Sequence, residues 1–120
     1  MRLYVDTNVF VDYLTTRLPC DFFFRAFVKR WILVISSATL AELRRLGFYS
    51  QAITLLSYYE VEVIIADDTD KRLATSYKTH LADAIHIVLA QKAKCDAIIT
   101  RNKRDFVESN IPVRGPNEKL

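Results

Sequence analysis

The stretch Leu-Tyr-Val-Asp-Thr-Asn at positions 3–8 constrains the fold of this chain more than any other segment. Its first three residues form a short apolar run that is rich in aromatic and β-branched character, which predicts a buried strand. The run stops at Asp6, and a helical apolar pattern follows from Val9 to Leu14. Asp6 therefore stands at the carboxyl end of a first strand, where open α/β sheets form their ligand crevice. The same position also suits a simple helix cap, so both roles are open for Asp6.

Apolar runs and helical patterns alternate along the rest of the chain. They predict further strands at 32–35, 61–65 and 97–99 and an edge strand at 111–113, where a proline is tolerated. Helical patterns lie between them, over 21–31, 37–46, 52–59, 70–77 and 81–90, with a short helix at 105–107. This alternation predicts an α/β fold, with three layers (α/β/α) around a central, mostly parallel sheet of four to five strands.

The second and third helices carry specific local expectations. The apolar stripe expected to face the core in the second helix is Phe23, Phe24, Phe27, Val28 and Trp31. Phe22 lies off that stripe, as a further core aromatic or as a contact for a partner. In the third helix we expect Ser37 as the N-cap, Gly47 as the C-cap and the leucines at 40, 43 and 46 on the inner face.

Size and composition suit a single domain spanning 1–120. The chain has 120 residues, of which 51% are hydrophobic and 26% charged, as in ordinary soluble globular proteins. No apolar run is long enough to span a bilayer and no signal-peptide pattern is present, so we expect no membrane association. The two glycines argue against a glycine-lined phosphate loop. Cys20 and Cys95 are isolated, without metal-ligand spacing, and are expected to be reduced thiols of a cytoplasmic protein.

The basic residues gather in short groups. The formal net charge of +3 permits an anionic partner without requiring one. Arg101, Lys103 and Arg104 form the densest group, and Arg44 and Arg45 form another. Each group is either a solvated face or a set of contacts for phosphates.

Three carboxylates, those of Asp6, Glu42 and Asp83, occupy unusual places. Each has a local explanation: a cap for Asp6, an ion pair with Arg45 for Glu42, and the helix dipole for Asp83. In the expected fold, however, all three share the carboxyl edge of the sheet. Two carboxylates about 4 Å apart repel by about 4 kcal/mol at an effective dielectric of 20, so such a cluster holds protons or recruits a cation. No His or Cys accompanies them at zinc spacing, and an all-oxygen site suits Mg²⁺ or Mn²⁺.

Neighbouring polar residues extend this site. Asn102 and Asp105 are both candidates for a fourth position: Asn102 coordinates through its amide oxygen, whereas Asp105 brings a charge or caps the final short helix. Thr7, Asn8 and Thr100 are suited to orient ligands or metal-bound water. His86 is either a core histidine bonded to a backbone carbonyl or a contact for the substrate.

Together these segments resemble the PIN domain, the small nuclease fold that includes the VapC-type toxins. The resemblance covers essentially the whole chain: Val5 to Asn8 at the start, the segment 36–43 with Glu42, the segment 81–86 with Asp83, and the segment 98–106. It implies an endoribonuclease dependent on Mg²⁺ or Mn²⁺, with Asp6, Glu42 and Asp83 as metal ligands. The family's fourth acid falls where this chain offers Asn102 or Asp105. The resemblance also implies frequent homodimers and, in the toxin branch, an antitoxin that blocks the site.

We therefore expect a single nuclease domain in which a cluster of acidic side chains binds the metal and RNA phosphodiester bonds are hydrolysed there. Glu42 holds the metal or helps to deprotonate the attacking water, Asp105 is a further catalytic candidate, and RNA is bound by Asn8, Arg101, Lys103 and Arg104. One alternative is an inactive PIN-like domain that binds RNA or protein. Another is a phosphoacceptor signalling domain that uses Asp67 or Asp68, which rests on fold analogy alone.

Overall fold

The computed structural model describes residues 1–16 and 19–120. In chain order its elements are β1 (Arg2–Val5), α1 (Thr7–Thr15), α2 (Phe22–Lys29), β2 (Ile32–Ser36), α3 (Ser37–Leu46), α4 (Tyr49–Leu56), β3 (Glu60–Ile64), α5 (Asp68–Ala74), α6 (Leu81–Lys92), β4 (Ala97–Ile99), the 3₁₀-helix η1 (Lys103–Phe106) and β5 (Val113–Arg114). The predicted elements are thus all present, with ends shifted by a few residues.

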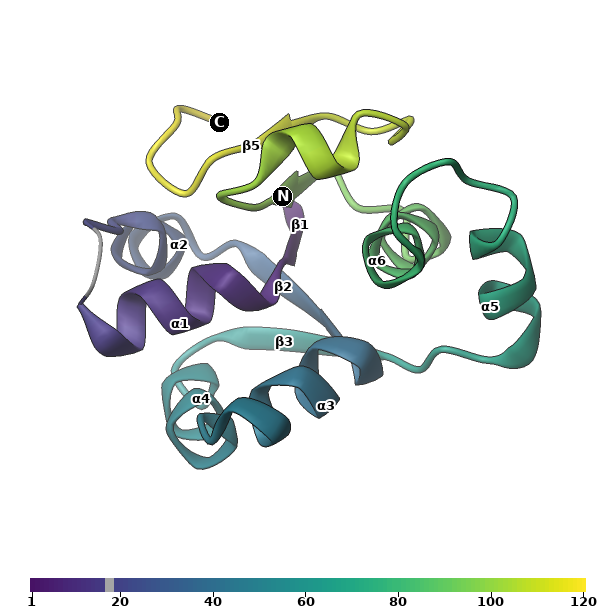
Figure 1. The fold of residues 1–120 in the computed structure, drawn as a ribbon. Helices are drawn as coiled ribbons and strands as arrows, with labels where there is room; N and C mark the ends of the chain where they lie inside the picture. The colour runs from purple at the N-terminus through teal and green to yellow at the C-terminus, as the bar shows by residue number, and fades with distance from the viewer. Residues whose placement is uncertain (17–18) are drawn as a thin grey trace.

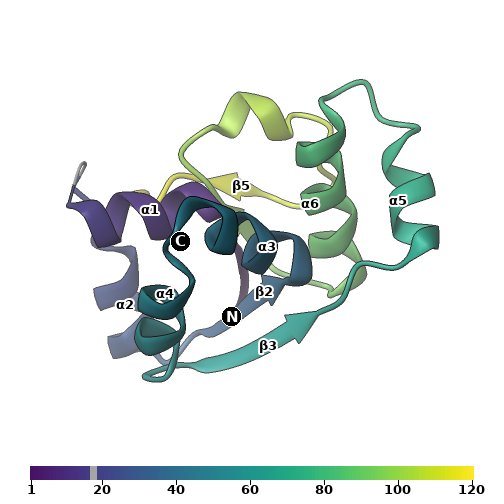
Figure 2. The ribbon, with the colours of Figure 1, turned by 60° about the horizontal axis from the view of Figure 1, so that its bottom comes forward.

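The described residues form a five-stranded sheet in the order β3-β2-β1-β4-β5, and every neighbouring pair is parallel. The chain lays down β1, β2 and β3 in one direction and then returns to add β4 on the other side of β1. Figure 2 shows β3 at the edge beside β2. The order of strands therefore reverses between β1 and β4, the place where open α/β sheets form a crevice. The ends of β1 and β4, at Asp6 and Thr100, therefore lie next to each other.

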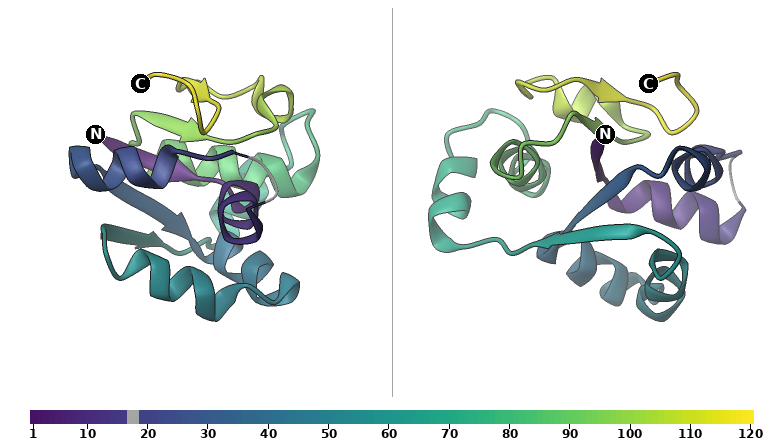
Figure 3. Two further views of the ribbon diagram at one scale, coloured as in Figure 1. Left: turned by 90° about the vertical axis from the view of Figure 1, so that its left-hand side faces the viewer. Right: turned by 180° about the vertical axis from the view of Figure 1, so that it is seen from behind.

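Helices cover both faces of the sheet, which confirms the three-layer architecture. Side chains alternate along β1, so Leu3 and Val5 pack into a core shared with α1 to α4, while Tyr4 packs against α6. In Figure 1, α1 and α2 lie to the left of the central strands and α5 and α6 to the right. The helix α5 packs on the outside of α6 through Ala74. The right-hand view of Figure 3 shows α5 at the edge of the molecule.

The expected inner face of the second helix was correct for Phe23 and Trp31, which are buried, and wrong for the other three residues. Phe24, Phe27 and Val28 are 71%, 57% and 59% exposed, whereas Phe22, which was placed off the stripe, is fully buried together with Phe23. Large apolar side chains nearly encircle this helix, so its sequence pattern does not select one face. Packing selects the buried face instead. The Phe23 ring contacts the rings of Phe10 and Tyr13 in α1, and the Phe22 ring contacts Trp31, which follows the helix.

Two expectations about α3 also need correction. Its N-cap is Ser36, whose hydroxyl accepts a hydrogen bond from Thr39 N at 3.0 Å, whereas Ser37 is the first helical residue and accepts from Ala66 N. Leu43 is buried as expected, but Leu46 is 50% exposed. Gly47 does end the helix, with φ of 86° in the left-handed region that glycine tolerates.

The remaining expectations concern cysteines, membranes and Asp67. Cys95 is buried and Cys20 is half-buried, and both are free thiols. None of the helices in residues 1–16 and 19–120 has the length and apolar character required to cross a bilayer. Asp67 follows the edge strand β3 and caps α5, where its carboxylate accepts from Asp70 N and pairs with Lys92. That place, far along the sheet from the reversal of strand order, does not support the phosphoacceptor alternative.

Candidate functional site

A hollow of about 290 Å³ opens at the carboxyl ends of β1 and β4, where the strand order reverses. Eight of the residues selected from the sequence line it: Asp6, Thr7, Asn8, Glu42, Asp83, His86, Arg101 and Asn102. They come from the end of β1, from α1, α3 and α6, and from the loop after β4. The fold thus brings together three acids that are far apart in the chain.

Asp6 is fixed at the centre of this edge. Its backbone N–H donates to Ile99 O of β4 at 2.9 Å, and its carboxylate caps α1 by accepting from Thr7 N at 2.8 Å. The second carboxylate oxygen accepts from Thr100 Oγ1 at 2.7 Å and from Asn8 Nδ2 at 3.0 Å. Asp6 is 7% exposed. The local explanation of Asp6 as a cap is therefore correct, and it is compatible with a position in the site.

Glu42 projects from α3 and is held from two sides. Its Oε1 accepts from Thr7 Oγ1 of α1 at 2.5 Å and lies 3.0 Å from His86 Nε2 of α6. Burial acts to raise the pKa of Glu42, but the hydrogen bond and charge of His86, the Thr7 hydroxyl and the charge of Arg45 together lower it. The direct partners of this carboxylate are thus Thr7 and His86, and Arg45 acts only through its charge.

His86 is a core residue, 2% exposed, but its partners are side chains, so the expected bond to a backbone carbonyl was wrong. Its Nδ1 lies 2.5 Å from the Tyr4 hydroxyl, which itself donates to Ser36 Oγ at 2.8 Å. Because an ionised carboxylate only accepts hydrogen bonds, Nε2 carries a proton and donates it to Glu42 Oε1. Burial acts to lower the pKa of His86, but the Tyr4 oxygen, the bond to Glu42 and the charge of Asp6 raise it well above its ordinary value.

Asp83 lies in the first turn of α6, across the hollow from Glu42. Within the described part of the chain, no hydrogen bond or ion pair to its carboxylate is present. Its pKa is raised, first by burial and then by the charges of Asp105 and Asp6, against the opposing effects of His86 and His80. Repulsion between acids, the effect that led us to expect a cation, therefore acts in the folded protein.

The structure distinguishes the two candidates for the fourth position. Asn102 lines the hollow, and its backbone N–H donates to Thr100 Oγ1 at 3.1 Å. Asp105 lies in η1 and is not part of the lining, although its charge acts on Asp83. Their catalytic roles stay predictions.

Of the three expected basic contacts, only Arg101 reaches the hollow. Its guanidinium forms an ion pair with Asp12, and its backbone N–H donates to Asn8 Oδ1 at 3.1 Å. Lys103 pairs instead with Glu118 at 2.5 Å, and Arg104 is exposed on η1.

Sequence reasoning missed Asp12. This acid is 2% exposed, lines the hollow and is paired with Arg101. A signal was available, because Asp12 follows Asn8 by four residues and so shares its helix face. In the same way, the spacing of three between Asp83 and His86 places both on one face of α6.

The residues present fit a hard divalent cation in kind, because four carboxylates and two side-chain amides line the hollow and the charge of Asp6 acts on Asp83. Among residues 1–16 and 19–120, however, no group of three or more His, Cys, Asp or Glu side chains is arranged to hold a metal ion. The fold thus gathers the predicted ligands around one hollow without closing them on a single point.

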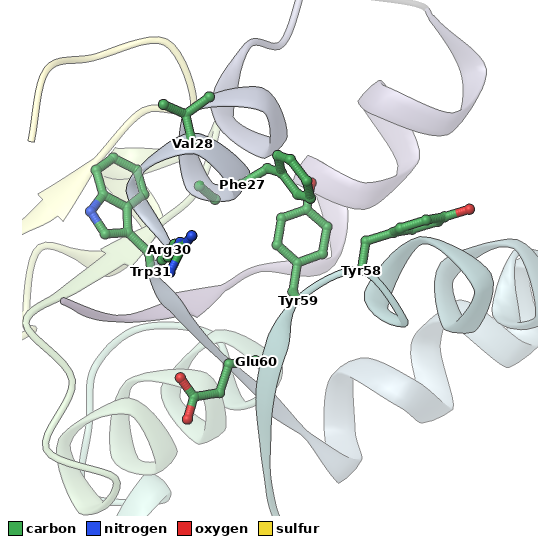
Figure 4. A pocket seen from close by; sticks show the side chains of 8 residues that line it. Phe27, Val28, Arg30, Trp31, Tyr58, Tyr59 and Glu60 are labelled. Carbon is green, nitrogen blue, oxygen red and sulfur yellow. The ribbon is translucent and has the colours of Figure 1, made fainter.

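A larger hollow, of about 470 Å³, lies elsewhere, between α2 and the start of β3. Figure 4 shows its lining, in which Phe27, Trp31, Tyr58 and Tyr59 bring aromatic rings together and Glu60 is the single carboxylate. None of the residues selected from the sequence as a site lies there. Its chemistry does not match phosphodiester cleavage, so we place the candidate site at the acidic hollow.

A family model described as "PIN domain" matches residues 2–104. The chain belongs to the PIN-domain family. No curated protein sequence matches this PIN domain significantly.

Several solved structures share the fold of this PIN domain. A chain of VapBC2 from Rickettsia felis, bound to a DNA fragment from their promoter, matches with a TM-score of 0.72 at 17% identity, covering 96% of this chain and 98% of that one. A chain of VapBC-1 from nontypeable Haemophilus influenzae matches with 0.72 at 20%, covering 98% and 100%. A chain of a toxin-antitoxin complex from Klebsiella pneumoniae matches with 0.60 at 22%, covering 98% and 99%. These likenesses show the fold.

Proposed function

We propose that this PIN domain, as one unit over residues 1–120, is an endoribonuclease that requires Mg²⁺ or Mn²⁺. The observation that carries the proposal is the lining of one hollow by Asp6, Glu42 and Asp83 at the reversal of strand order in a PIN fold. The raised pKa of Asp83 supports it, because neighbouring negative charge is what a divalent ion offsets. Asp6, Glu42, Asp83 and Asn102 would hold the ion.

The bound metal would lower the pKa of a water molecule and neutralise charge on the phosphate. Glu42, with its pKa lowered, is ready to accept a proton from the attacking water or to hold the metal. Asp105 acts through its charge on Asp83. Asn8 and Arg101 lie at the hollow to contact the phosphate, and Lys103 and Arg104 extend the positive surface along the RNA.

We further propose that the protein is the toxin of a toxin–antitoxin pair, with an antitoxin partner and a homodimeric state in the cytoplasm. Support comes from the solved structures of the same fold, one of which is described as a toxin–antitoxin complex and two others as VapBC2 and VapBC-1. Co-expression with a small protein encoded next to this gene, followed by purification, tests the pairing.

Metal removal tests the activity. Purified protein with added Mn²⁺ is expected to cleave a mixture of structured and single-stranded RNAs, EDTA is expected to reduce cleavage to background, and excess Mn²⁺ should restore it. A boiled sample in the same buffer controls for contaminating ribonuclease that survives heating. Binding of RNA without cleavage in any divalent metal would support the inactive, RNA-binding alternative instead.

A further inference from the structure

We propose that His86 is a positioning residue for Glu42, and that Tyr4 and Ser36 in turn fix His86. The inference rests on the proposed function, because it concerns how the metal-site carboxylate is oriented. Its basis is an unbroken series of side-chain hydrogen bonds. The series runs from Ser36 Oγ to the Tyr4 hydroxyl at 2.8 Å, from there to His86 Nδ1 at 2.5 Å, and from His86 Nε2 to Glu42 Oε1 at 3.0 Å.

This series passes through the apolar core between the sheet and α6. Tyr4 and Ser36 are fully buried, His86 is 2% exposed, and residues 87–90, which follow His86 along α6, are apolar. Within the described residues no buried side-chain nitrogen or oxygen lacks a partner. A polar series inside a core specifies one arrangement when fully bonded, whereas well-packed apolar residues of the same volume would serve stability as well. Its value here therefore lies in where it ends, at Glu42.

Two donors from different helices meet at the same oxygen of Glu42. Thr7 Oγ1 donates from α1 and His86 Nε2 from α6, both to Oε1. No donor within the described residues contacts Oε2. Two donors on one oxygen fix the plane of the carboxylate, and they leave the other oxygen for a cation or a water molecule. Hydrogen-bonded partners of this kind orient metal ligands and sustain metal affinity.

Three variants test the proposal. His86→Leu removes both bonds, His86→Gln keeps an N–H donor toward Glu42, and Tyr4→Phe removes only the support of His86. Tyr58→Phe is the matched control for Tyr4→Phe, because Tyr58 is 68% exposed and does not line the acidic hollow. For each we would measure thermal unfolding, Mn²⁺ affinity by calorimetry without RNA, and kcat and KM for RNA cleavage.

Positioning predicts losses graded by the bonds removed. His86→Leu should weaken Mn²⁺ binding and kcat by about 10–100-fold with little change in KM, His86→Gln by less than about fivefold, and Tyr4→Phe by an intermediate factor. Tyr58→Phe should match the wild type. Folded His86→Leu protein with wild-type Mn²⁺ affinity would overturn the proposal. Equal losses in His86→Leu and His86→Gln would also overturn it, since ring packing and not the bond to Glu42 would then matter.

One readout does not depend on metal or activity. In the ¹⁵N-labelled, metal-free protein, the Nε2–H group of His86 should be protected from solvent exchange and shifted as in a strong hydrogen bond; if His86→Leu fails to fold, this measurement and Tyr4→Phe decide. Free exchange of the Nε2 proton in the wild type would overturn the positioning role. Wild-type protein that neither binds Mn²⁺ nor cleaves RNA, but keeps the protected His86, would overturn the proposed function alone.

Discussion

Glu42 and Asp83 face the same hollow but are held in opposite ways. Two hydrogen-bond donors fix Glu42, and the net effect of its surroundings is a lowered pKa. No such donor contacts Asp83 within the described residues, and burial together with neighbouring acids raises its pKa. One wall of the hollow is therefore organised before any ligand arrives, whereas the other carries repulsion that only a positive charge relieves.

This difference shows how a small domain can contain a cluster of carboxylates and still fold stably. Stability comes from the wall where Glu42 is bonded, and affinity for a cation comes from the wall where Asp83 is not. Active sites often combine such strain with rigid support. Substituting each of the two acids in turn tests this comparison.

The largest effect is expected for Asp83→Asn. Cleavage should fall by more than about 100-fold, beyond the usual cost of losing a residue that merely supports a metal ligand. The metal-free variant should be as stable as the wild type or more stable by up to about 1 kcal/mol at neutral pH, because a carboxyl with a raised folded-state pKa loses its stabilising contribution as pH rises through that pKa. RNA cleavage and urea unfolding check both parts. Full activity would remove Asp83 from the site.

Glu42→Gln should destabilise the metal-free fold, which is the opposite of the effect expected for Asp83→Asn. We expect cleavage to fall by about 10–100-fold and the metal-free fold to lose about 1–2 kcal/mol, because His86 and Thr7 no longer meet a charged acceptor. The pKa of Glu42 is lowered in the fold, so its contribution is present above the ordinary carboxyl range and lost as pH falls through the folded-state pKa. Urea unfolding at several pH values measures this. A stabilised Glu42→Gln protein would contradict the comparison.

Asn102 and Asp105 allow a smaller adjustment of the Asp83 wall. Asn102→Asp adds a charge to the lining of the hollow and should strengthen Mn²⁺ binding by about 5–10-fold, since affinity rises with the number of charged ligands. Asp105→Asn is the matched change outside the lining and should alter Mn²⁺ affinity by less than about threefold, through its charge on Asp83 alone. Calorimetry compares them. A larger effect of Asp105→Asn would place Asp105, and not Asn102, at the metal.

The smallest effects are expected for the basic residues. In an Asp83→Asn background that prevents cleavage, Arg101→Gln should reduce the slope of log binding constant against log salt by about 0.7, the value for one lost phosphate contact on a single strand. Lys103→Gln should change the slope less, because Lys103 does not line the acidic hollow that Arg101 reaches. Fluorescence anisotropy with a labelled RNA measures both. Equal slopes for the two variants would contradict the assignment of Arg101 as a phosphate contact.

Periodicity and strand-end chemistry were sufficient to predict the architecture. The alternation of strands and helices and the parallel sheet are confirmed. The gathering of Asp6, Glu42 and Asp83 at one hollow agrees with the prediction from their places after strands and in a first helical turn. The inner face of α2 could not be predicted, because aromatic residues surround that helix and its neighbours decide which are buried.

Local sequence determined the layered fold and the acids at its edge, because backbone geometry repeats every two residues in strands and every 3.6 in helices. Only the tertiary structure decided the partners of His86, the burial of Asp12 and the presence of Asn102 rather than Asp105 in the lining. Those outcomes depend on contacts between side chains 82 positions apart for Tyr4 and His86, and 89 apart for Asp12 and Arg101. A local sequence pattern cannot show which residues that far apart in the chain will be in contact.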